Sequence, residues 1–204
     1  GQIDQYGTLH LSNFENQSHI VQVTSSDADA DDLNYSIYGW QDLHHFEINS
    51  STGDLRFKNP PDFEFPTDHD GDGIYAVLVR VSDGKAHADQ SLFVRLTDQN
   101  EYPVDLNTGT TLTLSENQPV NTFIGEFFAS DPDANANLEF DLVDGNGSQG
   151  NAYFSVDGNG TLRSAQMFDF ESNQSVFSIR VGVSDEHNSS ISQTFQISLL
   201  NVIE

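Results

Sequence analysis

Three aspartates at alternate positions of a glycine-containing segment offer the clearest local chemistry in this sequence. Asp68, Asp70 and Asp72 belong to a stretch that reads DHDGDG. In a tight turn this spacing can aim three carboxylates at one ion, and Gly73 permits the bend after the third. The spacing matches the first half of an EF-hand calcium loop, but Val79 occupies the position of the bidentate Glu, and a strand is expected to follow. We therefore expect a calcium-binding turn, with a solvated hairpin turn as the alternative.

Other acidic residues stand at the edges of predicted strands and between the two halves of the chain. Oxygen-only ligands in this number suit Ca²⁺, which takes about 6–8 oxygens in flexible geometry. Any one of these acids alone would be read as surface charge, so the prediction depends on the set and its order. The set comprises Glu15, Asp62, Glu64, Asp98 and Glu101, followed by Asp131, Asp133 and Asp185.

The composition excludes several classes of protein. The 204 residues include 32 acidic and only 7 basic side chains, a net charge of −25 that disfavours binding to nucleic acid or to an anionic membrane. No apolar run approaches the ~18–20 residues of a membrane-spanning helix, so no membrane insertion is expected in this segment. The chain has no cysteine, which excludes disulfides and thiol chemistry. The acidic excess implies either a solvated, salt-adapted surface or carboxylates that are neutralised by bound cations.

An internal repeat organises the sequence. Five motifs recur in the same order at offsets of 101 to 108 residues, which predicts two homologous modules with boundaries 1–103 and 104–204. The repeated segments are 14–17 and 115–118, 26–29 and 130–133, 46–55 and 154–162, 62–64 and 169–171, and 81–83 and 183–185.

Each module is predicted to be all-β. Apolar residues alternate with other residues over 75–82 and 177–184, a period of two that indicates half-buried strands. Partner strands are expected at 92–96 and 195–199, and shorter strands near 8–11, 20–24, 33–37, 46–48 and 54–57. The pattern predicts two tandem Greek-key, immunoglobulin-like β-sandwiches of about seven strands each.

The order of these motifs resembles that of tandem cadherin repeats, and more closely of the bacterial cadherin-like repeats. The matching marks are the acidic motifs at 15–16, 27–29, 62–64 and 81–83, and the linker 98–103, which reads DQNEYP. The resemblance covers nearly the whole chain. Each motif alone is weak, but their combination is specific. The linker departs from the animal form Asn-Asp-x-x-Pro, which leaves the number of ions at the junction open.

The resemblance implies calcium held at the junction between successive modules. Carried over by position, the first module would supply Glu15, Asp62, Glu64, Asp98, the Asn100 carbonyl and Glu101. The second would supply Asp131, Asp133 and Asp185, with Asn137 as a further carbonyl donor. By the same logic Asp27, Asp29 and Asp83 would be half of a site toward a preceding module. Glu116, Asp169 and Glu171 would be half of a site toward a following one.

These expectations give a function. We expect calcium-rigidified extracellular adhesion or extender modules of a large bacterial surface or secreted protein, whose partners are calcium, neighbouring repeats and a polysaccharide or another surface protein. No motif of a hydrolase or metalloenzyme occurs in the sequence, so an enzyme is not expected. The alternative is a carbohydrate-binding module of a secreted polysaccharide-degrading protein, in which Trp40, Tyr38 and Tyr153 would contact sugar. For Trp40 itself we favour a buried position that closes the core.

Overall fold

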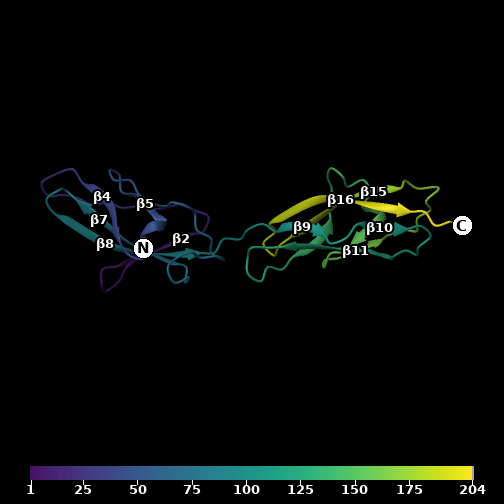
Figure 1. The fold of residues 1–204 in the computed structure, drawn as a ribbon, viewed down its shortest axis with the longest axis horizontal. Coiled ribbons are helices and arrows are strands. Elements are labelled where there is room, and N and C mark those ends of the chain that lie inside the picture. Colours follow the sequence, from purple (N-terminus) through teal and green to yellow (C-terminus); the bar gives the residue numbers. More distant parts are fainter. Residues whose placement is uncertain (204) are drawn as a thin grey trace. The chain divides into compact units, whose positions relative to one another are not determined.

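The computed structural model describes residues 1–203, which form two compact units, Gly1–Gln99 and Asn100–Glu204. The predicted modules differ from these units only in residues 100–103, which the structure groups with the second unit. Each unit is built almost entirely of strands (Figure 1). The all-β prediction is confirmed, and the two units are described separately below.

Unit 1 is a sandwich of a five-stranded and a three-stranded sheet. In the larger sheet, β2 pairs in parallel with β8, and the other neighbours are antiparallel. A short 3₁₀ helix, η1 (Leu43–His45), precedes β5. The strand orders are β1 (Gln2–Ile3), β2 (Leu9–Phe14), β8 (His87–Thr97), β7 (Ile74–Ser82), β4 (Asn34–Gly39), and β3 (His19–Gln22), β6 (Asp54–Phe57), β5 (Phe46–Ile48).

Unit 2 repeats this plan with two four-stranded sheets. The parallel pair recurs as β10 with β16, and the 3₁₀ helix recurs as η2 (Asn151–Tyr153) before β13. The strand orders are β10 (Leu112–Ser115), β16 (Ser190–Leu200), β15 (Val176–Ser184), β12 (Glu139–Leu142), and β13 (Phe154–Val156), β14 (Thr161–Ser164), β11 (Phe123–Ser130), β9 (Val104–Thr108).

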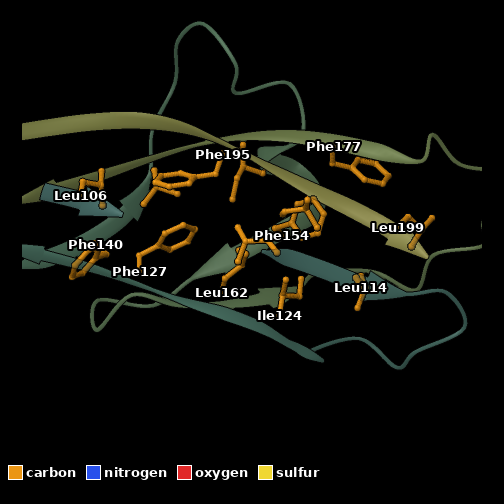
Figure 2. Close-up of a cluster of buried hydrophobic side chains, with 14 of the residues drawn as sticks. Leu106, Leu114, Ile124, Phe127, Phe140, Phe154, Leu162, Phe177, Phe195 and Leu199 are labelled. Carbon is orange, nitrogen blue, oxygen red and sulfur yellow. The ribbon is translucent and has the colours of Figure 1, made fainter. Parts of the chain in front are cut away.

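The core of each unit lies between its sheets and follows from the alternation of residues along the strands. In β7, Tyr75, Val77 and Val79 are buried, because successive side chains of a strand point to opposite faces. In unit 2, apolar side chains from both sheets point toward one another (Figure 2), and the Phe154 ring stacks 5.4 Å from that of Phe168. This apolar packing is the main source of stability that holds the loops at the ends of each unit.

Trp40 does not take the place expected from the sequence. Its side chain is 45% exposed, in the loop that follows β4. The core of unit 1 is filled instead by Phe46, Phe57 and Tyr75, whose rings contact one another at 5.0 to 6.5 Å. The prediction of a buried Trp40 is therefore wrong, because three other aromatic rings already occupy the space between the sheets.

Candidate metal centres

The aspartate turn before β7 has a preformed backbone. One oxygen from each of Asp68, Asp70 and Asp72 lies within 4.8 Å of the others. Asp68 is buried, and its two oxygens accept the N–H groups of Asp72 and Gly73 at 3.0 Å each. Gly71 and Gly73 have φ angles of 72° and 73°, a left-handed conformation that favours glycine. The turn therefore presents three carboxylates on one side, as the sequence predicts.

The three carboxylates of this turn repel one another. The hydrogen bond with Asp68 and the charge of Asp72 raise the pKa of Asp70 above its ordinary value. Burial opposes ionisation of Asp68, but the N–H donors of Asp72 and Gly73 outweigh it and hold the pKa of Asp68 below the usual value. A bound cation would relieve the repulsion that raises the pKa of Asp70.

Asp42 braces the aspartate turn, and sequence reasoning missed it. Its buried carboxylate accepts the His69 N–H at 2.7 Å and the Ala76 N–H at 2.9 Å. It thereby ties the turn and the start of β7 to the loop after β4. A single aspartate in a loop carries no motif, so nothing in the sequence distinguishes it from a surface charge.

A second acidic group lies in unit 1 around Glu15. Glu15 is fully buried (0% exposed), and it offers an oxygen within 4.8 Å of oxygens from Glu64 and Asp98. Its carboxylate accepts the Phe63 N–H at 2.8 Å and the Gln99 N–H at 2.9 Å. Glu15 therefore joins the end of β2 to the loop that carries Glu64 and to the segment after β8.

The same arrangement recurs in unit 2 around Glu116. Glu116 is 1% exposed and offers an oxygen within 4.8 Å of oxygens from Asp169 and Glu171. Its carboxylate accepts the Phe170 and Val202 N–H groups, each at 2.7 Å. The repeated motif thus builds the same buried glutamate twice, with Glu64 and Glu171 at equivalent positions. The third acid differs, being Asp98 in unit 1 and Asp169 in unit 2.

Asp62 occupies a different role from Glu64. Its carboxylate accepts the Phe65 N–H at 3.0 Å and shapes the loop 62–65. Among residues 1–203, it is not part of a group in which three acids bring oxygens within 4.8 Å of one another. Its assignment as a ligand stays a prediction.

A network of hydrogen bonds holds the start of unit 2. The Asn100 side-chain amide donates to Asp185 and to Ser189, both at 2.8 Å. The Glu101 N–H donates to Asp133 at 2.9 Å, and the Asp133 N–H donates to a second aspartate, Asp131, at 3.0 Å. The structure therefore brings these five predicted ligands, from Asn100 to Asp185, into one network within the unit.

Asp131 is an acid of that network whose ionised form is disfavoured by its surroundings. Burial and the charge of Asp133 raise its pKa above the ordinary value. Its Oδ2 atom is buried and accepts no hydrogen bond from the residues that the structure describes. Asn137 lies nearby in sequence, and its N–H donates to Glu186 at 2.8 Å, a contact that the sequence motifs do not indicate. A buried carboxylate oxygen without a donor fits a site for a cation.

The acids predicted to face a preceding module are placed differently. Asp27 accepts the N–H groups of Asp29 and Asp31, and Asp83 accepts those of Lys85 and Ala86. The N–H donors of Ala86 and Lys85 lower the pKa of Asp83. Within the described part of the chain, Asp27, Asp29 and Asp83 do not bring three oxygens within 4.8 Å of one another. These side chains shape loops, and their role as ligands stays a prediction.

The acidic groups have the ligand chemistry that calcium requires. The gathered side chains are carboxylates without His or Cys, which favours a hard cation over zinc or copper. Two of the groups contain a fully buried carboxylate, which is costly unless its charge is compensated. The residues therefore fit calcium.

Sequence comparison finds similarity to cadherins, and the relatives named below are animal proteins. Residues 110–200 match the model of the cadherin domain. The cadherin-related protein hmr-1 of Caenorhabditis elegans is 32% identical over 153 residues, which are 75% of this chain and 5% of that protein. Protocadherin-16 of Rattus norvegicus is 28% identical over 193 residues, which are 88% of this chain and 6% of that protein. The chain thus spans less than a tenth of the length of these relatives.

Solved structures show the same fold over nearly the whole chain. The EC1-2 structure of human protocadherin-24 matches 97% of this chain and 97% of its own with a TM-score of 0.67 at 17% identity. Drosophila N-cadherin EC1-4 matches 97% of this chain and 48% of its own with a TM-score of 0.63 at 20% identity. No helix among residues 1–203 has the length and apolar character needed to cross a membrane. Residues 110–200 therefore match a cadherin domain, and over most of its length the chain is similar in sequence and in fold to tandem cadherin repeats.

Proposed function

We propose that this chain is a pair of calcium-rigidified extracellular adhesion modules that belong to a larger bacterial surface or secreted protein. The observation that carries the proposal is the buried glutamate that occurs once in each unit. Glu15 and Glu116 are almost inaccessible to water, and each has two further acids close by. A fold that gains nothing from these charges would not be expected to bury them at equivalent positions twice.

The physical argument concerns the cost of gathering these charges. Three carboxylates with oxygens within 4.8 Å repel one another, and the two backbone donors of each buried glutamate stabilise only that one charge. Calcium, when bound, supplies the positive charge and accepts about 6–8 oxygen ligands. The chain's own contribution is to fix Glu15 and Glu116 by hydrogen bonds before any ion arrives.

Rigidity would arise in the segment that connects the two units. Asp98 closes the acidic group of unit 1, and Asn100 and Glu101 begin the network of unit 2, with only one residue between Asp98 and Asn100. We propose that ions shared by the acids on the two sides of this segment fix the angle between the units. In their absence the carboxylates repel one another, and only hydrogen bonds such as that from the Gln99 N–H to Glu15 hold the segment.

Further predicted sites fit the same proposal. The turn that contains Asp68 would bind an ion within unit 1. The acidic group of Glu116, Asp169 and Glu171 would share ions with a following repeat, and Asp27, Asp29 and Asp83 with a preceding one. The proposal thus assigns the chain to an array of repeats that works outside the cell, where calcium modules bind at about 10⁻⁴–10⁻³ M.

A double variant tests the proposed ligands at the linker. Small-angle scattering of the wild type should show a more extended and less variable particle in calcium than in EDTA. Glu64→Ala combined with Asp98→Ala should abolish this difference while both cores stay folded. The matched control is Asp32→Ala combined with Glu47→Ala, two exposed acids of the same unit, which should behave as the wild type. A double variant that keeps the full calcium response would show that Glu64 and Asp98 are not the ligands.

A further inference from the structure

Unit 1 carries a row of aromatic side chains on the outer side of its five-stranded sheet. We call this row the aromatic face; it consists of His10, Tyr38, Trp40 and Phe93. His10 pairs with Phe93 across β2 and β8, and the neighbours of Phe93 in β8, Leu92 and Val94, are buried in the core. Because side chains alternate along a strand, the aromatic face points away from the core. Trp40 and Tyr38 are 45% and 59% exposed.

The rings of the aromatic face are fixed by their contacts. The rings of His10 and Trp40 meet the Phe93 ring edge-to-face, with centroids 5.4 and 5.5 Å away. Trp40 has a φ of 78°, which a bulky side chain adopts only when its surroundings impose it. The Arg80 guanidinium lies 3.3 Å from the centre of the Tyr38 ring and is held by Asp89. Rings held in this way lose little entropy when a ligand binds.

The fold itself does not require these aromatic side chains. β8 and β16 are equivalent eleven-residue strands, and the place of Phe93 is taken in β16 by the exposed Gln196. Leu11 pairs with Val94 in unit 1, and Leu112 pairs with the equivalent residue, Ile197, in unit 2, so Leu11 and Leu112 are equivalent. The residue before each is therefore equivalent too, and the exposed Thr111 takes the place of His10. The same sheet in unit 2 is therefore polar where unit 1 is aromatic. A requirement of folding would act on both units.

Two carboxylates adjoin the aromatic face, but each has a basic partner: Asp4 lies 3.1 Å from His10, and Asp89 pairs with Arg80. A hollow of about 530 Å³ adjoins Phe93, and no carboxylate lines it. Its lining includes Gln2, His10, Ser12, Ile74, Phe93 and Arg95. Arg95 is exposed and forms no ion pair with any residue from 1 to 203. In a chain with a net charge of −25, this hollow is a place that offers an anion a cation and hydrogen-bond donors.

We infer that the aromatic face and this hollow bind an acidic polysaccharide, a chain whose sugar rings carry carboxylate or sulfate groups. The rings of Trp40 and Phe93 supply rigid, partly apolar surface against which the C–H face of a sugar can pack. The guanidinium of Arg95 suits a carboxylate or sulfate, which it can bind through two parallel hydrogen bonds. The inference names a ligand class for the proposed adhesive function and rests on that function, but it involves none of the proposed calcium ligands.

The test is a titration of the full chain that follows the fluorescence of Trp40, the only tryptophan. The probes are the octasaccharide of hyaluronan and oligogalacturonate as acidic glycans, and cellohexaose as a neutral one. Three variants introduce the residues that unit 2 has at the equivalent positions: Phe93→Gln, His10→Thr and Arg95→Ser. The control is Phe128→Gln, which replaces an exposed phenylalanine of unit 2.

We expect at least one acidic glycan to bind and to change the Trp40 emission, with about tenfold or greater loss of affinity in Phe93→Gln and Arg95→Ser. Phe128→Gln should bind as the wild type does. Three results would overturn the inference: no binding of either acidic glycan, equal binding of cellohexaose that Arg95→Ser leaves unchanged, or self-association that depends on Phe93. A chain that binds no acidic glycan but keeps its calcium response in small-angle scattering would overturn this inference alone and leave the calcium part of the proposed function standing.

Discussion

Replacement of Glu15 by glutamine separates the structural role of this residue from its proposed role as a ligand. One oxygen of Glu15 accepts the Phe63 N–H and the other accepts the Gln99 N–H. A glutamine has only one acceptor oxygen, so its amide nitrogen would face one of the two donors. One partly buried N–H then loses its partner, which costs about 1–3 kcal/mol. Glu15→Gln should therefore destabilise unit 1 by this amount even in EDTA.

Calcium should increase the difference in free energy of unfolding between this variant and the wild type. For one site with a dissociation constant of about 10⁻⁴–10⁻³ M, about 10 mM calcium stabilises the folded state by about 1.4–2.7 kcal/mol. The wild type should gain this free energy of unfolding, and Glu15→Gln should lose most of the gain.

The assay is urea unfolding in EDTA and in calcium. Trp40 lies in unit 1, so its emission follows the unfolding of that unit alone. Glu116→Gln is the matched control, because it makes the same change in unit 2 and should leave the Trp40 transition unaltered in EDTA. If Glu15→Gln lost less than about 0.5 kcal/mol in EDTA, the hydrogen bonds of Glu15 would not matter as described. If it kept the full gain in calcium, Glu15 would not be a ligand.

Three further predictions follow from other carboxylates. Asp70→Asn should remove one bound calcium ion per chain in a calorimetric titration. It should leave the urea midpoint in EDTA nearly unchanged, because Asp70 is exposed. An unchanged stoichiometry would exclude the aspartate turn as a calcium site. Asp42→Ala should destabilise unit 1 by about 1–3 kcal/mol or more, since the His69 and Ala76 N–H groups lose their acceptor. A smaller loss of unfolding free energy, measured by Trp40 emission, would show that these hydrogen bonds do not hold the turn as described. The Thr161 N–H lowers the pKa of Asp157, so unit 2 should lose stability as the pH falls from about 4 through that lowered value. Asp157→Asn should reduce this loss in acid unfolding followed by circular dichroism, and an identical acid transition would contradict it.

Much of the fold follows from the sequence because its signals are local and strong. Strands β5 and β6 have the predicted bounds, and β7 and β15 are found where the alternation of apolar residues indicates half-buried strands. The burial of Glu15 and Glu116 is not predictable from the sequence, because burial propensity would place a glutamate at the surface. The two residues are candidate ligands because their motif occurs twice and because its order resembles that of cadherin repeats.

Other features depend on tertiary contacts that leave no mark in the sequence. Trp40 is exposed because three other aromatic rings fill the core of unit 1 and the Phe93 ring holds it from the outside. The role of Asp42 depends on a tertiary contact, because its carboxylate lies in the loop after β4 and accepts the N–H groups of His69 and Ala76. The bacterial origin stays a prediction, since the relatives compared are animal proteins.

The central claim is that the gathered carboxylates bind calcium, and calorimetric titration of the calcium-free chain tests it most directly. We predict two or more ions per chain, with dissociation constants of about 10⁻⁴–10⁻³ M. Glu15→Gln and Glu116→Gln should each lower the stoichiometry. Absence of heat at millimolar calcium, together with identical unfolding curves in calcium and EDTA, would contradict the claim. The buried glutamates would then have only a structural role, and the exposed acids would be surface charge.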